Sequence, residues 1–222
     1  MHIGLIGGIG PAATEFYYHN LVKAFKAANK KLELTIVHDD VTEVVSNIAS
    51  NSKDKQAKQF LEMTLRLQQA GADVVVVSSI AAHFCITELE ALSPLPVVSI
   101  ISALQLEFAR RGLQKVGLLG HKVTMSSKLF GGISSTEIVV PLAENLNTVH
   151  EEYIHMATTA KADDRQREVI FAIGKSLCTE QGAQAVILAG TDLFLAFDGY
   201  DSGFTVIDSA LVHIDALVGM VD

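Results

Sequence analysis

The sequence predicts an α/β fold: two pseudo-symmetric three-layer α/β/α lobes with mainly parallel sheets. Short apolar segments alternate with longer amphipathic segments along the chain, a pattern typical of parallel strands joined by helices. Residues 74–77 are four consecutive valines, as expected for a strand buried on both faces. The third observation is an internal repeat, which suggests that one topology occurs twice.

The repeat relates strand-like segments about half a chain apart. Its three pairs follow the same order and have similar offsets: 3–7 with 116–120, 71–79 with 182–190, and 97–99 with 206–208. Colinear self-similarity of this kind indicates duplicated structural units. We therefore expect a first lobe of residues 1–99 and 209–222 and a second lobe of residues 100–208.

The first half is predicted to contain four strands separated by helices. Pro11 suits the first turn of a helix, and Gly112 suits a helix C-terminus. Segment 41–53 is rich in Ser, Asn and Thr and is expected to be a loop or short helix that could act as a mobile flap. The expected elements are strand 2–6, helix 12–29, strand 31–38, helix 54–70, strand 73–78, helix 86–92, strand 95–100 and helix 102–111.

The second half repeats this alternation. Asp163 or Asp164 is expected to cap a long helix, and Asp208 with Ser209 is expected to cap the last one. Segment 191–203 contains three aromatic residues and is predicted to be an apolar loop. The expected elements are strand 115–119, a helix near 125–130, strand 137–140, helix 147–160, helix 164–181, strand 184–189, strand 204–207 and a helix from 209.

Composition excludes several classes of function. The net charge is −8 and the largest basic clusters are pairs, so we expect neither nucleic acid nor an anionic membrane as a partner. No apolar run is long enough to span a bilayer, and residues 1–15 lack the features of a signal peptide. A cytoplasmic location follows as the default expectation. The histidines and the two cysteines have no metal-ligand spacing, so no metal site is predicted.

Polar residues follow the predicted buried strands. Ser79 and His83 come after the valine run, at the carboxyl end of a strand, where ligands bind in open α/β sheets. The glycine turn Gly8-Ile9-Gly10 precedes a helix and suits a phosphate or carboxylate. With Ala13 and with Asp39 or Asp40, this turn also satisfies a dinucleotide-binding fingerprint. The acid lies farther beyond the turn than is usual in such a site, and the equivalent turn in the second half lacks the fingerprint. A dinucleotide-binding oxidoreductase is therefore only a remote alternative function.

Three motifs resemble the aspartate/glutamate racemase family (Asp/Glu/hydantoin racemases). They are Gly-Leu-Ile-Gly-Gly-Ile-Gly-Pro-Ala-Ala-Thr at 4–14, Ser-Ile-Ala-Ala-His at 79–83 and Ala-Gly-Thr-Asp-Leu at 189–193. The resemblance is colinear across nearly the whole chain. It implies two similar lobes with the active site in the cleft between them, commonly a homodimer, an amino acid or related carboxylate as ligand, and no cofactor.

The resemblance also implies a two-base relay in which one cysteine from each half faces each side of the substrate α-carbon. Here Ser79 and Gly190 occupy the two cysteine positions, so both sulfurs are absent. A thiol starts from a pKa near ~8.5, whereas a serine hydroxyl needs an adjacent base. His83 could be that base or could cap a helix. Cys85 could approach the site or could be a small apolar residue of the core. Gly190 could be present because its lack of a side chain makes room at the site.

Substrate capture also departs from the family. Residues 37–48 contain no Arg or Lys, so the arginine that clamps a side-chain carboxylate in aspartate-type members is missing. A neutral or cationic amine fits the acidic residues better, and Lys122 or the amides of the glycine turn could take a carboxylate. Asp192 could equally act as a stabilising acid at a helix start. The expected ligand-contacting residues are Gly8, Ile9, Gly10, Asp39, Ile80, Ala81, His121, Lys122, Thr124, Thr191 and Asp192.

These observations leave two function classes open. The first is a cofactor-independent amino-acid racemase or isomerase, or a related lyase, that acts at the α-carbon with Ser79, His83 and Cys85 as its chemical groups. The second is a catalytically inactive binding or regulatory protein that keeps the fold.

Overall fold

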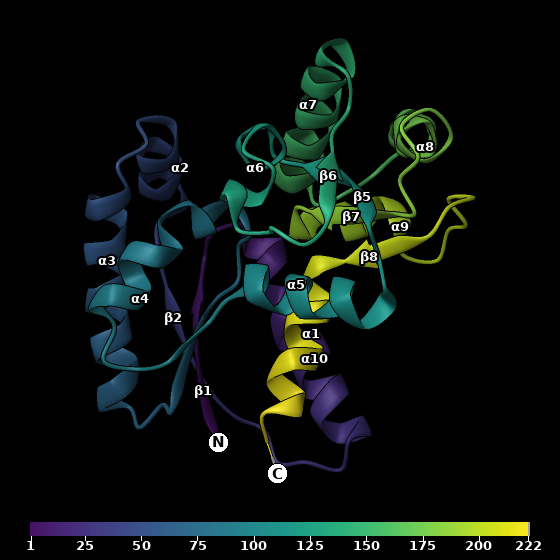
Figure 1. The fold of residues 1–222 in the computed structure, drawn as a ribbon. Helices are drawn as coiled ribbons and strands as arrows, with labels where there is room; N and C mark the ends of the chain where they lie inside the picture. The colour runs from purple at the N-terminus through teal and green to yellow at the C-terminus, as the bar shows by residue number, and fades with distance from the viewer. Residues whose placement is uncertain (222) are drawn as a thin grey trace. The chain divides into compact units, whose positions relative to one another are not determined.

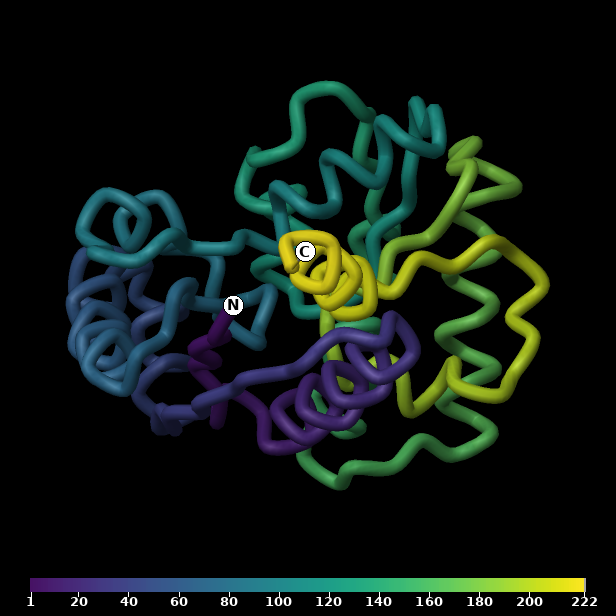
Figure 2. Tube along the Cα trace, turned by 90° about the horizontal axis from the view of Figure 1, so that it is seen from below, coloured from purple at the N-terminus to yellow at the C-terminus, as the bar shows by residue number. Residues whose placement is uncertain are grey.

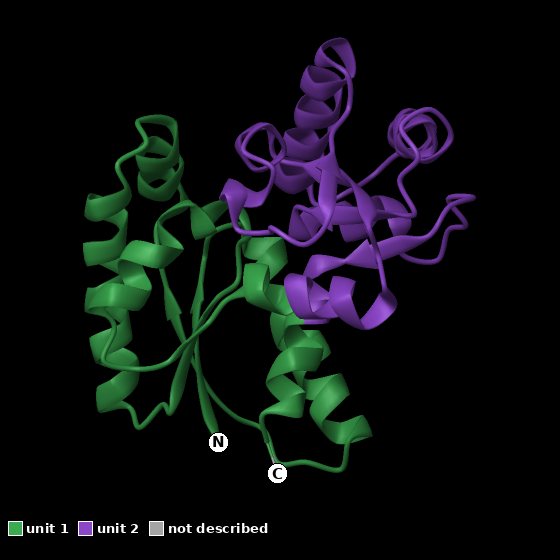
Figure 3. Ribbon diagram, viewed as in Figure 1, with its two compact units in different colours: residues 1–103, 213–222 green, residues 104–212 purple. Residues whose placement is uncertain are grey.

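A computed structural model of the chain describes residues 1–221. The chain forms two compact units (Figure 3): unit 1 comprises Met1–Ala103 and the described residues from His213 onward, and unit 2 comprises Leu104–Val212. The chain enters unit 2 within helix α5 (Ile100–Arg111) and leaves it within helix α10 (Ser209–Gly219). The expected lobe boundaries lie a few residues before the observed ones.

Unit 1 is built on a parallel four-stranded sheet of order β2-β1-β3-β4. Its central strand β3 is the valine run and is wholly buried, as predicted. Helices α3 and α1 cover opposite faces of this sheet (Figure 1). The elements are β1 (His2–Gly7), α1 (Pro11–Ala27), β2 (Glu33–His38), α2 (Val41–Ala49), α3 (Lys53–Gln69), β3 (Val74–Val77), η1 (Ala81–Cys85), α4 (Ile86–Leu92) and β4 (Val97–Val98).

Unit 2 repeats the topology with a parallel sheet of order β6-β5-β7-β8. Helices α7 and α8 both contact its central strand β5. After α5, the elements are β5 (Lys115–Gly120), α6 (Lys122–Ser126), η2 (Leu129–Gly131), β6 (Glu137–Val139), α7 (Ala143–Thr159), α8 (Asp164–Thr179), β7 (Ala185–Ala189), η3 (Thr191–Leu193), α9 (Phe194–Phe197) and β8 (Val206–Asp208), followed by α10. The α/β class and the repeat are thus confirmed.

Matched glycines hold the helices close to the strands in both units. A Cβ atom on Gly4 of β1 would lie 2.9 Å from Leu67 Cδ1 of α3, and one on Gly117 of β5 would lie 2.9 Å from Leu177 Cδ1 of α8. Real Cβ atoms do not pack this closely, so each glycine lets a leucine reach the sheet. The two halves therefore share their packing as well as their strand order.

Local hydrogen bonds decide between the alternatives that the sequence left open at two helix starts, and one segment differs from expectation. Segment 41–53 begins with helix α2, because the Asp40 side chain accepts a hydrogen bond from the Thr42 amide and caps it. Helix α8 starts after Asp163, which forms a reciprocal capping box with Gln166. Segment 191–203 is not wholly a loop, because it starts with η3 and α9.

A buried polar cluster links α1, β4 and α10 within unit 1. The Tyr17 hydroxyl and His213 Nδ1 are 2.9 Å apart, and His213 Nε2 lies 2.9 Å from the Val98 carbonyl oxygen. The carbonyl can only accept, so Nε2 carries the proton and Nδ1 accepts from Tyr17. Figures 1 and 2 show α10 beside α1. Burial lowers the pKa of His213 to about 3.

Candidate functional site

The first group of predicted site residues follows β3. Ser79 is partly exposed, whereas Ile80 and Ala81 are buried at the start of η1. The chain curls into η1 after Ser79, which brings His83 back toward it. The contact joins His83 Nδ1 to the Ser79 carbonyl oxygen at 2.9 Å. No hydrogen bond joins the imidazole to the Ser79 hydroxyl among the described residues.

Both ring nitrogens of His83 are engaged by the backbone. Nδ1 donates to the Ser79 carbonyl, and Nε2 accepts from the Ile100 amide at 3.2 Å. These partners fix one neutral tautomer. The side chain is 1% exposed, and burial lowers its pKa to about 4. In this arrangement His83 joins η1 to the start of α5 and has no free nitrogen with which to take a proton from Ser79.

Cys85 lies at the end of η1 with its thiol buried. Its Sγ is 3.5 Å from the Ala82 carbonyl oxygen. Burial, aided by the negative charge of Glu88, raises the pKa of the thiol to about 12. A thiol in this environment stays protonated at neutral pH, so it is not an activated nucleophile.

The glycine turn lies between β1 and α1. Its amides are largely used within the turn: Gly8 N–H donates to Thr14 Oγ1 at 2.8 Å, and Gly10 N–H donates to the Gly8 carbonyl oxygen at 3.0 Å. A hydrogen bond from Ile9 N–H is not observed in the described part of the chain. The turn therefore offers a ligand fewer amides than the glycine pattern predicts.

Gly8→Ala is expected to destabilise the protein by about 1–3 kcal/mol. Gly8 has φ +88°, and a Cβ there would lie 2.4 Å from the Asp39 carbonyl oxygen. Gly112→Ala is the matched control, because Gly112 has φ +67° with open space around its Cβ position. Urea denaturation of both variants separates the steric cost from the backbone strain. Equal losses would contradict the proposed close approach.

The two aspartates that follow β2 have structural partners. Asp39 is 2% exposed and accepts hydrogen bonds from Gln59 Nε2 at 2.7 Å and from the Asp40 amide at 2.9 Å. Burial raises the pKa of the Asp39 carboxyl, and these hydrogen bonds oppose the shift. Asp40 caps α2. Both carboxylates stabilise the region around α2 and α3, and Asp39 has little surface to offer a ligand.

The second group of predicted residues follows β7 in unit 2. Gly190 is buried, with extended backbone that any residue could adopt. The space where its side chain would stand is occupied by Tyr153 of α7. A Cβ atom on Gly190 would lie 2.4 Å from Tyr153 Cε2 and 2.9 Å from Cζ. The position that the resemblance assigns to the second cysteine is thus filled by an aromatic ring.

Tyr153 is linked to the neighbouring acid. Its hydroxyl donates to Asp192 Oδ2 at 3.2 Å, and Asp192 is 2% exposed. The other carboxylate oxygen, Oδ1, is buried and has no hydrogen-bond partner among the described residues. Burial raises the pKa of Asp192, and burial together with the Asp192 charge raises that of Tyr153 well above its usual value. Thr191, beside them, is also buried.

The turn after β5 contributes a histidine to the same neighbourhood. The His121 ring stands edge-on to Tyr153, with centroids 6.2 Å apart, and to His150, with centroids 4.6 Å apart. His121 Nδ1 accepts from the Val123 amide at 3.2 Å, so the neutral ring carries its proton on Nε2. Burial lowers the pKa of His121 to about 4.

Lys122 and Thr124 have different environments. Lys122 is exposed, and its Nζ donates to Asn147 Oδ1 at 2.9 Å. The Thr124 hydroxyl is buried and has no hydrogen-bond partner within residues 1–221. Unit 2 thus gathers His121 and Asp192 around Tyr153, which the sequence prediction missed. The sequence signal for Tyr153 was Gly190, because a missing side chain there leaves space that another residue must fill.

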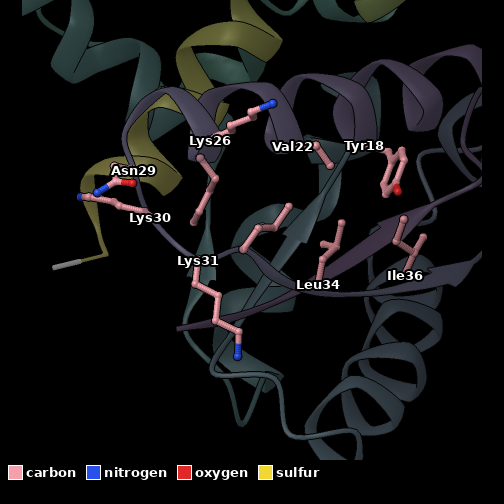
Figure 4. Close-up of a pocket in the computed structure, with 10 residues that line it drawn as sticks. Tyr18, Val22, Lys26, Asn29, Lys30, Lys31, Leu34 and Ile36 are labelled. Carbon is pink, nitrogen blue, oxygen red and sulfur yellow. The ribbon is translucent and has the colours of Figure 1, made fainter.

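A separate groove of about 750 Å³ lies between α1 and β2 of unit 1 (Figure 4). Tyr18, Val22, Leu34 and Ile36 line it, and the ammonium ends of Lys26 and Lys31 point away from it. None of the predicted site residues lines this groove. Residues 1–221 contain no set of three or more His, Cys, Asp and Glu side chains arranged to hold a metal ion. No helix in that range has the length and apolar composition needed to cross a membrane.

Comparison with known proteins places this architecture in one family. An aspartate racemase homologue from Pyrococcus horikoshii is 26% identical with a TM-score of 0.82, covering 99% of this chain and 98% of its own. A Yersinia pestis structure proposed to be an Asp/Glu racemase is 25% identical with a TM-score of 0.84 and the same coverage. Glutamate racemase from Aquifex pyrophilus shares the fold at 20% identity, with a TM-score of 0.64, covering 100% and 84%. The Asp/Glu/hydantoin racemase model matches residues 6–217, so the chain belongs to the Asp/Glu/hydantoin racemase family.

Proposed function

We propose that this protein binds an amino acid or a related small carboxylate and does not racemise it through paired thiols. Family membership supports the ligand class. The absence of racemisation through paired thiols is supported by the environment of Gly190. This residue has no side chain, and the Tyr153 ring occupies the space where one would stand. The equivalent position in unit 1 is Ser79, whose potential base His83 is held by two backbone groups.

Isothermal titration calorimetry against a panel of ligands tests this function. The panel is glycine, both enantiomers of alanine, serine, aspartate, glutamate and phenylalanine, and malonate as a carboxylate without an amine. We expect saturable binding of at least one member, and stronger binding of a neutral amino acid than of aspartate or glutamate, because residues 37–48 have no cationic side chain. Absence of binding by the whole panel contradicts the proposal.

A second candidate function is isomerisation at the α-carbon with Ser79 as a reacting group. The observation that favours it is the partial exposure of Ser79 at the carboxyl end of β3, where ligands bind in related sheets. This function requires His83 to leave its backbone partners or another base to act. Exchange of the α-proton in D2O that is lost in Ser79→Ala would support it.

The remaining expectations concern assembly and location. We propose that the protein acts in the cytoplasm, the default expectation from its sequence, and that it forms a homodimer, as the family resemblance implies. Light scattering coupled to size-exclusion chromatography measures the assembly directly, and a mass near 23.8 kDa, that of one chain, would contradict the dimer.

A further inference from the structure

The Tyr153 ring occupies space at the end of β7 and so limits the size of a ligand that can bind there. Its ring replaces the side chain that Gly190 lacks, with Cε2 2.4 Å and Cδ2 2.9 Å from the ideal Cβ position. A side chain at position 190 and the Tyr153 ring therefore cannot both stand where they would overlap. A side chain at 190 would displace the ring, and loss of the ring would open a vacancy beside Gly190.

The ring is held in place from two sides. Its hydroxyl donates to Asp192 Oδ2 at 3.2 Å, and the ring stands edge-on to His121 with centroids 6.2 Å apart. Helix α7, which carries Tyr153, also contacts η3, which carries Asp192. A tyrosine whose hydroxyl is hydrogen-bonded and whose ring packs against a neighbour keeps one position. Its shape can then discriminate between ligands.

We propose that Tyr153 is a specificity-determining residue that limits the size of the ligand accepted beside Asp192. The inference rests on the proposed binding function, because it concerns which amino acid or carboxylate is bound. The buried, unpartnered Asp192 Oδ1 supplies an acceptor for a donor group such as an ammonium, and the Tyr153 ring excludes bulk next to it. A small amino acid satisfies both conditions.

Replacing the ring tests the inference through selectivity. Tyr153→Ala removes the ring, and Tyr153→Phe keeps it while removing the hydroxyl. Binding of glycine, alanine, serine and phenylalanine to each variant is measured by calorimetry. We expect Tyr153→Ala to shift the ratio of phenylalanine to glycine affinity by about tenfold or more toward phenylalanine, since pocket-size changes discriminate on this scale. Tyr153→Phe is expected to keep the wild-type ratio.

Controls separate a binding role from a structural one. Tyr18→Ala removes an exposed ring on α1 and should leave the ratio unchanged. Tyr153→Leu provides an intermediate size if Tyr153→Ala does not fold, and its ratio should move in the same direction. An unchanged ratio in folded Tyr153→Ala or Tyr153→Leu, with the wild type still binding, overturns the inference alone. If neither the wild type nor the variants bind any panel member, the proposed function fails and the inference falls with it.

Discussion

Gly190→Cys, which restores the sulfur position, is expected to lower the free energy of unfolding by about 1–3 kcal/mol. The new Cβ would stand 2.4 Å from Tyr153 Cε2, so the ring must move. Its movement breaks the hydrogen bond to Asp192, leaving a buried carboxylate with both oxygens unpartnered, which is itself costly. Urea denaturation measures the loss.

A matched substitution and a double-mutant cycle isolate this effect. Gly219→Cys introduces the same side chain where its Cβ would contact nothing within 4 Å and should be nearly neutral. In a Tyr153→Ala background the cost of Gly190→Cys should fall, because the ring has gone. Equal costs of Gly190→Cys with and without Tyr153 would show that the two positions are independent, against the geometry described above.

Acidification is expected to remove roughly 4 kcal/mol of stability by pH 5, through His83 and His213 together. Their pKa values are lowered to about 4 and about 3 in the folded state, below the usual 6.5, because both rings are buried. Between pH 6.5 and the folded pKa values the unfolded chain binds more protons, so folding weakens as the pH falls. At pH 5 each histidine costs about 2 kcal/mol.

The two rings act as one cluster. His83 and His213 stand edge-on, 6.3 Å apart, so protonating one makes protonation of the other harder. Urea midpoints between pH 8 and pH 5 measure the effect in the wild type and in His213→Gln, which should show a shallower dependence. His19→Gln, at an exposed position, is the control and should follow the wild type. A pH dependence in His213→Gln as steep as in the wild type would contradict the role assigned to this histidine.

The sequence was sufficient for the fold because its signals are local and repeated. Four valines marked β3, and paired motifs marked the equivalent strands of the second half. Helix ends were harder to place, because they depend on single hydrogen bonds. The cap that Asp40 places on Thr42 turns a segment of loop-like composition into helix α2, and composition alone cannot distinguish the two.

The site was harder to predict than the fold, because side-chain partners are set by packing. His83 was a candidate base for Ser79, but its imidazole contacts the Ser79 carbonyl rather than the hydroxyl. Asp39 was expected to contact a ligand, but its carboxylate is buried and accepts a hydrogen bond from Gln59. Tyr153 lies on a helix far along the chain from Gly190, and no local pattern connects them.

The account is tested most directly by the α-proton of a bound amino acid. An amino acid that calorimetry shows to bind is incubated with the wild-type protein in D2O, and its α-proton signal is followed by NMR. The account predicts that binding persists while the α-proton is retained, because neither thiol of a two-base relay is present. Loss of that signal at a rate proportional to protein concentration, together with formation of the opposite enantiomer, would contradict it.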